Sequence, residues 1–229
     1  MVILCLVILQ DIQLKILVNL EKWLNVDNDN IAFIHINKCG GTSIKYVNPE
    51  KKLIYMALNN DYLLNLKNNK SWRDIEKITF VRNPYNRIIS LFCMSVRDQY
   101  KFTFDEIINI ITDDSIKYRA EDGGMIKNTK EYIKRHGLPM THEHYSVYDK
   151  ETKTLNVDHV FKIEEISEKS NIIKKLLGIT QDIPHKNKTS NCVDLDYFSK
   201  EQIRKINDYF HLDFSIFNYE KLWITAWSI

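Results

Sequence analysis

Short apolar runs rich in Ile, Val, Leu and Phe alternate along this chain with longer stretches in which apolar residues recur every three or four positions. The runs have the length and the content of β-branched and aromatic residues that are typical of buried strands. They lie at Ile31 to Ile36, Lys52 to Leu58, Ile78 to Val81 and Val157 to Ile163. The pattern therefore predicts four core strands with helices between them.

The clearest helix signal follows the third run. One apolar face at positions i, i+3, i+4 and i+7 is formed by Tyr85, Ile88, Ile89 and Phe92. Asn83 suits the N-cap of this helix and Pro84 suits its first turn. Further helices are expected over Phe104 to Ile111, Gly124 to Arg135, Ser167 to Leu177 and Glu201 to Phe210.

End signals support two of these helices. Gly178 follows Leu177 as a stop signal, and Ser199 begins a capping box with Gln202 three residues later.

Two outer segments are expected to pack onto the core. One is an amphipathic helix within residues 1–28, with apolar positions at Leu6, Leu9, Ile12, Ile16 and Leu20. The other is the aromatic tail formed by Phe214, Phe217, Tyr219, Trp223 and Trp227.

Size and charge narrow the class of protein. With 229 residues, 44% of them hydrophobic, the whole chain from 1 to 229 can bury one core as a single domain. The 32 Lys and Arg residues are nearly balanced by 30 Asp and Glu residues. A dedicated nucleic-acid binder would be strongly basic, so no nucleic-acid partner is expected and any anion site must be local.

The cysteines and the N-terminus bear on location. None of the four cysteines forms a C-x-x-C pair, which favours free thiols in a reducing compartment. The apolar stretch Met1 to Gln10 is too short to span a bilayer and has no preceding basic residues. A soluble cytoplasmic protein without a transmembrane segment is therefore expected, and attachment to a membrane surface, as in the Golgi, is the alternative.

A candidate anion site follows the first strand. The sequence continues as Asn37-Lys38-Cys39-Gly40-Gly41-Thr42-Ser43 and then enters a segment that can form a helix. Two glycines let a backbone approach an anion closely, while a lysine and two hydroxyl groups add charge and donors. The pattern is not a Walker A loop, because the lysine precedes both glycines. Taken alone, a Gly-Gly pair after a strand is as readily a simple turn.

A second candidate lies at the end of the third strand. Arg82 is expected at the carboxyl end of that strand, where open α/β sheets bind ligands, and Ser90 lies on the following helix with Arg87. Arginine is suited to two-pronged contact with a phosphate. The simpler alternative is that Arg82 forms a salt bridge and Ser90 is a solvated surface residue.

Taken together, these stretches resemble the sulfotransferases that use 3′-phosphoadenosine 5′-phosphosulfate (PAPS), in the branch with the Golgi-type carbohydrate sulfotransferases (sulfotransferase family 2). The segment from His35 to Ser43 resembles the 5′-phosphosulfate loop of that family, and Phe80 to Ser90 resembles its 3′-phosphate motif. Val157 to Glu164 is similar to a later strand of the family. Pro184 to Lys188 resembles a loop usually written x-H-x-N-K.

The resemblance implies a fold, a reaction and a set of binding residues. The fold is α/β, a P-loop NTPase-like three-layer core with a central parallel sheet flanked by helices. The reaction moves a sulfuryl group from PAPS to a hydroxyl acceptor, here expected to be a carbohydrate, without a metal. Lys38 is the catalytic residue, and PAPS would be bound by Lys38, Cys39, Gly40, Gly41, Thr42, Ser43, Arg82 and Ser90.

The chain departs from the family in three places, one of which is that Asn48-Pro49 cuts short the helix after the loop. Asn37 replaces a proline of the loop, and no histidine lies between residues 36 and 134, where many relatives carry a proposed general base. The candidates for that base are Glu50, Asp61, His142 and His144, and the two histidines can equally be exposed loop residues. Glu164 is expected to have a structural role. Two other functions stay open, a phosphotransferase of the nucleoside-kinase type and an inactive nucleotide- or glycan-binding module.

Overall fold

The computed structural model describes residues 30–45, 47, 52–56, 74–98, 102–118, 129–183 and 193–223. Its strands are β1 (Asn30–Ile34), β2 (Lys52–Met56), β3 (Glu76–Val81), β4 (Tyr148–Asp149), β5 (Thr154–Leu155) and β6 (His159–Lys162). Its α-helices are α2 (Gly41–Lys45), α5 (Pro84–Arg97), α6 (Phe104–Thr112), α7 (Lys130–His136), α8 (Ser170–Leu177), α9 (Lys200–Tyr209) and α10 (His211–Ile216). Short 3-10 turns are η1 (Glu143–Tyr145), η2 (Ile163–Glu165) and η3 (Leu195–Tyr197).

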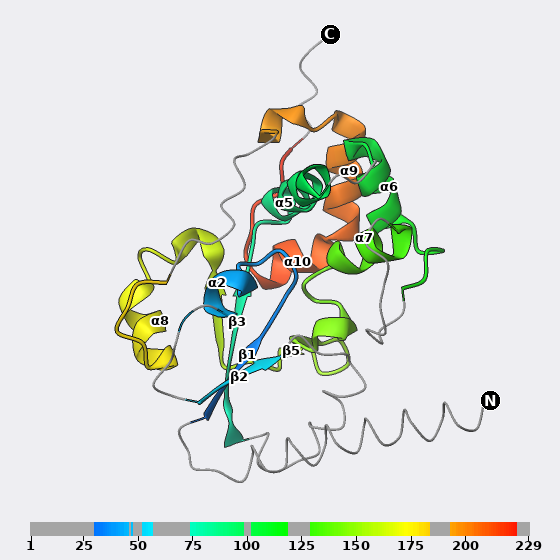
Figure 1. Ribbon diagram of the computed structural model, residues 1–229. Coiled ribbons are helices and arrows are strands. Elements are labelled where there is room, and N and C mark those ends of the chain that lie inside the picture. Colours follow the sequence, from blue (N-terminus) through cyan, green and yellow to red (C-terminus); the bar gives the residue numbers. More distant parts are fainter. Residues whose placement is uncertain are drawn as a thin grey trace, which may run out of the picture.

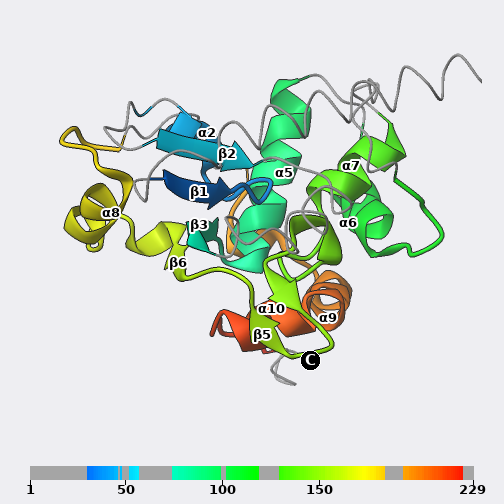
Figure 2. The same cartoon turned by 90° about the horizontal axis from the view of Figure 1, so that it is seen from below.

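One parallel sheet carries the fold. Its strands lie in the order β2-β1-β3-β6, and every neighbouring pair is parallel. These are the four strands that the apolar runs predict. Helix α8 lies on the opposite side of the sheet from α6, α7 and α9 (Figures 1 and 2). The protein therefore has the α/β fold with a helix-flanked parallel sheet that the sequence predicts.

Parallel pairing brings the two candidate motifs to one edge of the sheet. Ile34 of β1 is paired with Thr79 of β3, and the Thr79 hydroxyl donates a hydrogen bond of 2.8 Å to the Ile34 carbonyl. Because β1 and β3 run in the same direction, both strands end at the same edge. Residues 35–43, after β1, and residues 82–90, after β3, therefore begin side by side.

Two hydrophobic clusters hold the elements together. The first is formed by side chains of the sheet strands together with Ile173 and Leu177 of α8. Within it, the Phe33 and Phe80 rings lie 5.6 Å apart, edge to face. The second joins helices, with members from α5, α6, α7, α9 and α10. Helix α5 leaves the edge of the sheet directly after β3 and packs in the second cluster, so it links the sheet to the helices.

The predicted helix ends agree with the structure at three places. The Asn83 side chain accepts a hydrogen bond of 3.0 Å from the backbone N–H of Tyr85, which caps α5. Ser199 and Gln202 make both hydrogen bonds of a capping box at the start of α9. Gly178 ends α8 with φ of 61°, a conformation that favours glycine.

Other expectations differ from the structure. Trp223 is 83% exposed, so the expectation that it packs onto the core is wrong, whereas Phe214 and Phe217 are buried. The expected helix from Gly124 to Arg135 is described only as α7, because residues 119–128 lie outside the described residues. Helix α10 and the antiparallel β4–β5 pair have no counterpart in the expected elements.

Several predictions fall outside the described residues, namely the helix within residues 1–28, the loop 184–188, Trp227, and the candidate bases Glu50 and Asp61.

Cys93 is disulfide-bonded, so the expectation that all four cysteines are free thiols is wrong, whereas Cys39 is free and buried. Among the helices that the structure describes, none has the length and apolar content required to cross a bilayer.

Candidate functional site

The loop between β1 and α2 has an unusual backbone. Lys38 has φ of 66° and Gly40 has φ of 77°, both in the left-handed region. A non-glycine residue in that region is strained, and such strain is concentrated at functional sites. A Cβ atom at Gly40 would lie 2.7 Å from Cδ1 of Ile163, and one at Gly41 would lie 2.0 Å from Cδ2 of His35. The left-handed backbone therefore favours glycine at position 40, and the His35 ring leaves no room for a side chain at position 41.

Arg82 reaches this loop from the end of β3. Its Nη1 donates a hydrogen bond of 3.4 Å to the Lys38 carbonyl, although the two residues are 44 positions apart in the chain. The backbone N–H of Arg82 lies 3.4 Å from Sδ of Met140. The two stretches that the sequence marks as anion-binding candidates thus meet, close enough for one ligand to contact both.

Positive charges gather around Lys38. The pKa of the Lys38 ammonium is lowered from 10.5 to about 8, mainly by burial and in part by the charges of Arg97, Arg82 and Arg87, while Asp98 opposes the shift. Like charges held together in a partly buried place disfavour the protonated form. An anion bound among these cations would relieve that repulsion. The electrostatics of the loop would therefore favour an anionic ligand.

Arg87 of α5 is 2% exposed and ties the loop to the chain after α7. Its Nε donates to the Asn37 carbonyl at 2.9 Å, Nη1 to the Leu138 carbonyl at 2.6 Å, and Nη2 to the His136 carbonyl at 3.3 Å. Nη2 also lies 3.3 Å from the Tyr145 hydroxyl. These bonds occupy the guanidinium, so Arg87 fixes the position of the loop instead of reaching a ligand.

A buried carboxylate supports the other side of the loop. Asp213 of α10 accepts hydrogen bonds from the backbone N–H groups of Met140 and Thr141 at 2.7 and 2.9 Å, and from the Thr141 hydroxyl at 2.7 Å. Burial raises the pKa of Asp213. Met140, held in this way, places its sulfur 3.7 Å from the Cys39 sulfur. Burial also raises the pKa of Cys39 to about 11, so its thiol stays protonated and packs as a neutral group.

Two further polar residues lie in or beside α5, namely Ser90 within the helix and Glu164 at its start. Ser90 lies one turn after Arg87 and is 6% exposed, so it is not the solvated surface residue of the simpler alternative. Glu164 accepts hydrogen bonds from the backbone N–H of Asn83 at 2.9 Å and from the Tyr219 hydroxyl at 3.0 Å. Glu164 thereby holds the start of α5, which agrees with the structural role expected for it.

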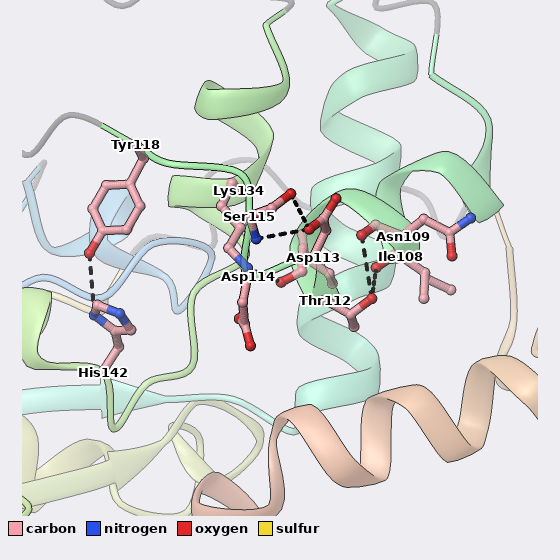
Figure 3. Close-up of polar contacts among 10 residues, drawn as sticks. Ile108, Asn109, Thr112, Asp113, Asp114, Ser115, Tyr118, Lys134 and His142 are labelled. Carbon is pink, nitrogen blue, oxygen red and sulfur yellow. Dashed lines mark hydrogen bonds and ion pairs between the residues drawn. The ribbon is translucent and has the colours of Figure 1, made fainter.

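The two candidate histidines lie on η1 and in its cap. Nδ1 of His142 accepts the backbone N–H of His144 at 3.0 Å and lies 3.4 Å from the Tyr118 hydroxyl, a contact visible in Figure 3. Since Nδ1 is an acceptor, neutral His142 carries its proton on Nε2. His144 is 3% exposed and its ring lies 5.1 Å from that of Tyr145. Neither is an exposed loop residue, and their role as bases stays a prediction.

A third histidine, His136, is part of the same site although no sequence pattern marks it. It ends α7, and its carbonyl is one of the three that Arg87 binds. The charge of Lys38 contributes to the lowered pKa of the His136 ring. The position of His136 depends on the bond from Arg87 of α5 to its carbonyl. Hydrophobic periodicity and local motifs in the sequence do not reveal such a long-range contact.

Comparison with known families agrees with this geometry. The model of one family, described as the sulfotransferase family, matches residues 23–220, which include the glycine loop, Arg82 and Ser90. The chain belongs to the sulfotransferase family. Among curated proteins, no sequence matches it.

Membership gives this sulfotransferase its general chemistry, the transfer of a sulfuryl group, and agrees with the parallel sheet that presents both motifs at one edge. Across the described part of the chain, no group of three or more His, Cys, Asp or Glu side chains could hold a metal ion. The charges that act on Lys38 in this sulfotransferase are mainly those of arginines, Arg97, Arg82 and Arg87, which suits an anionic ligand.

Proposed function

We propose that this protein transfers a sulfuryl group from PAPS to a hydroxyl group of an acceptor, and that the acceptor is a carbohydrate. The observation that supports the proposal most strongly is the 3.4 Å contact between Arg82 and the Lys38 carbonyl. It unites two motifs that each suit a different anionic end of one nucleotide. The carbohydrate acceptor rests on the resemblance of both motifs to the carbohydrate branch of the family.

The donor would lie along the two motifs. Its phosphosulfate end would be held by Lys38, Cys39, Gly40, Gly41, Thr42 and Ser43, and its 3′-phosphate by Arg82 and Ser90. The positive charges around Lys38 fit this ligand, because they lower the pKa of Lys38 in the absence of an anion. On the same grounds we propose that the core is related to that of the P-loop nucleotide kinases, with the anion loop after its first strand.

The chemistry needs positioning and charge stabilisation. When the bond between sulfur and the bridging oxygen breaks, negative charge develops on the leaving phosphate oxygen. An ammonium group fixed beside that oxygen stabilises the developing charge more than the ground state, which accelerates the reaction. With a pKa of about 8, Lys38 is mostly protonated at neutral pH and can supply that charge.

The donor assignment can be tested by isothermal titration with three nucleotides. Adenosine 3′,5′-bisphosphate (PAP) is compared with AMP, which lacks only the 3′-phosphate, and with ATP, which a kinase would prefer. PAP is expected to bind at least tenfold more tightly than either, and Arg82→Met is expected to remove the preference over AMP. Arg204→Met, on the exposed face of α9, is the matched control. A preference for ATP would support the kinase alternative and overturn the proposal.

Enzymatic activity requires a second assay. Transfer of radiolabelled sulfate from PAPS is measured on a panel of glycans, with Lys38→Ala as the inactive control. Transfer by the natural protein and its loss in Lys38→Ala would support an enzyme. Tight binding of PAP without transfer to any acceptor or to water would support the inactive binding module instead.

A further inference from the structure

The His136 ring is held in one tautomer. Its Nδ1 lies 2.9 Å from the carbonyl oxygen of Tyr132, one turn earlier in α7, and its ring packs on the Tyr132 ring with centroids 4.1 Å apart. A carbonyl oxygen only accepts hydrogen bonds, so Nδ1 must carry the proton. The lone pair of the neutral ring is then on Nε2. Among the described residues, Nε2 of His136 has no hydrogen-bond partner, and it is available to accept a proton.

The Arg87 side chain fixes the backbone of His136 beside the loop between β1 and α2, called the donor loop below. The guanidinium of Arg87 binds the His136 carbonyl through Nη2 and the carbonyl of Asn37, the residue before Lys38, through Nε. Both carbonyls contact the same planar group, so the end of α7 and the loop cannot move apart without breaking buried bonds. The end of α7 is therefore held beside this loop, and the charge of Lys38 acts on the His136 ring.

Three other described histidines, His142, His159 and His211, lack this combination. His142 uses Nδ1 as an acceptor from the His144 backbone, so the lone pair of its neutral ring is engaged. His159 lies 2.7 Å from Oε1 of Glu76, at the opposite end of β3 from Arg82. His211 resembles His136 locally, since its Nδ1 lies 2.9 Å from the Asp208 carbonyl, but it is exposed on α10.

Three cations act on the His136 ring. The pKa of the ring is lowered to about 4, mainly by burial and in part by the charges of Lys38, Arg135 and Arg87, while the bond to the Tyr132 carbonyl opposes the shift. These groups belong to the donor loop, to α7 and to α5. A bound nucleotide would bring several negative charges among the same cations. Its charge would offset theirs and raise the proton affinity of the ring.

We propose that His136 is the general base of this enzyme, and that binding of the anionic donor beside Lys38 is what gives it enough proton affinity to act. In the reaction, the acceptor oxygen forms a bond to sulfur while the bond from sulfur to the PAP oxygen breaks. The acceptor proton passes to Nε2, the leaving oxygen keeps the electron pair, and the imidazolium later returns its proton to water. This inference rests on the proposed function, since it assumes PAPS as donor.

The first test is spectroscopic and needs no acceptor. Protein with ¹⁵N-labelled histidine is titrated by NMR with and without PAP, and His136→Asn assigns the signal. Asparagine keeps a donor for the Tyr132 carbonyl and removes Nε2, so it preserves the structural bond. We expect His136 to be protonated on Nδ1 and its pKa to rise by at least one unit with PAP, whereas His211 should not respond. A His136 pKa that PAP leaves unchanged, in protein that binds PAP, overturns the donor-dependent part of the proposal.

The second test is kinetic. Turnover is measured both as transfer to the glycan panel and as release of sulfate from PAPS to water, so one acceptor is always present. For His136→Asn we expect unchanged affinity for PAP and unchanged KM for PAPS, with kcat lowered by about 10²- to 10⁴-fold, the usual effect of removing a general base. Its kcat should also lose the acid-side pH dependence of the natural enzyme. His211→Asn, which removes a similar ring at an exposed position, should retain full kcat.

The outcomes separate this inference from the donor assignment. If the natural protein fails to bind PAP, the proposed function fails and the base assignment fails with it. If the natural protein binds PAP and turns PAPS over, but His136→Asn has the same kcat and pH profile, only the base assignment is overturned. Unchanged affinity for PAP in His136→Asn shows that the variant is folded.

Discussion

Gly41 has no room for a side chain, because the His35 ring occupies the space that a Cβ atom would need. Gly41→Ala should therefore shift the loop and the Lys38 backbone next to it. We expect a loss of about 1–3 kcal/mol in the free energy of unfolding, as for other overpacked sites, and at least tenfold weaker binding of PAP. Urea unfolding and isothermal titration measure the two effects.

Removing the His35 ring gives a control for the predicted clash at Gly41. In His35→Ala the ring is absent, so adding Gly41→Ala should cost less in that background than in the natural protein. Residues in direct contact couple in this way in double-mutant cycles. Equal costs in both backgrounds would contradict the assigned clash.

Lys38 links donor binding to pH. In the free protein its pKa is lowered to about 8, and a bound anion would raise that value. Above pH 8 the free protein loses the Lys38 proton while the complex keeps it, so binding must take up a proton. From pH 7 upward the affinity for PAP should fall as pH rises through about 8, by up to tenfold per unit. Isothermal titration from pH 6 to pH 9.5 measures this dependence.

An arginine at the same position is the matched control, since a guanidinium stays protonated over this pH range. Lys38→Arg should bind PAP with little pH dependence between pH 7 and pH 9.5. An identical decline in both proteins would show that another group is responsible.

At the scale of elements, α5 positions the site through one buried side chain. Arg87→Met leaves the carbonyls of Asn37, Leu138 and His136 without the donor that binds them. Each buried acceptor left unsatisfied costs about 1–3 kcal/mol, so we expect a total loss of at least about 3 kcal/mol in the free energy of unfolding. Urea unfolding measures it, with exposed Arg204→Met expected to change stability by less than about 0.5 kcal/mol.

The elements themselves are largely predictable because their signals are local. The apolar face of α5, its Asn83 cap and the capping box at Ser199 each need only neighbouring residues, and the structure confirms all three. Strands β4 and β5 are two residues long each, too short for any periodicity to show. The burial of Arg87 was equally out of reach, because its acceptors lie in segments 49 to 51 residues away.

At the scale of the whole molecule, sequence reasoning identifies the residues proposed to bind the donor better than the residue proposed to act on the acceptor. Lys38 and Arg82 follow two adjacent parallel strands, so finding the strands is enough to bring them together. His136 instead depends on a guanidinium that joins α5 to the end of α7. Such a bridge is a property of the packed molecule, whereas the Thr-His-Glu-His pattern of His142 and His144 is visible in the sequence and makes them candidates for the base.

The partly buried His136 ring should also affect the acid stability of the whole protein. Its pKa is about 4 in the folded protein and 6.5 in the unfolded chain. Between these values the unfolded chain binds more protons, so the free energy of unfolding rises with pH from 4 to 6.5 and falls as the solution is acidified through that window. The full effect is on the order of 3 kcal/mol. Urea unfolding at pH 4.5 and pH 7 measures it.

His136→Asn isolates this contribution, because asparagine does not titrate. The variant should lose less stability between pH 7 and pH 4.5 than the natural protein. Asp213 acts in the opposite direction: burial raises its pKa, so its contribution is present at low pH and is lost as pH rises through the folded-state pKa. Asp213 is present in both proteins, and comparing the two slopes cancels it. Equal slopes would show that His136 is not held neutral in the folded protein, which would also remove the electrostatic basis for its activation by the donor.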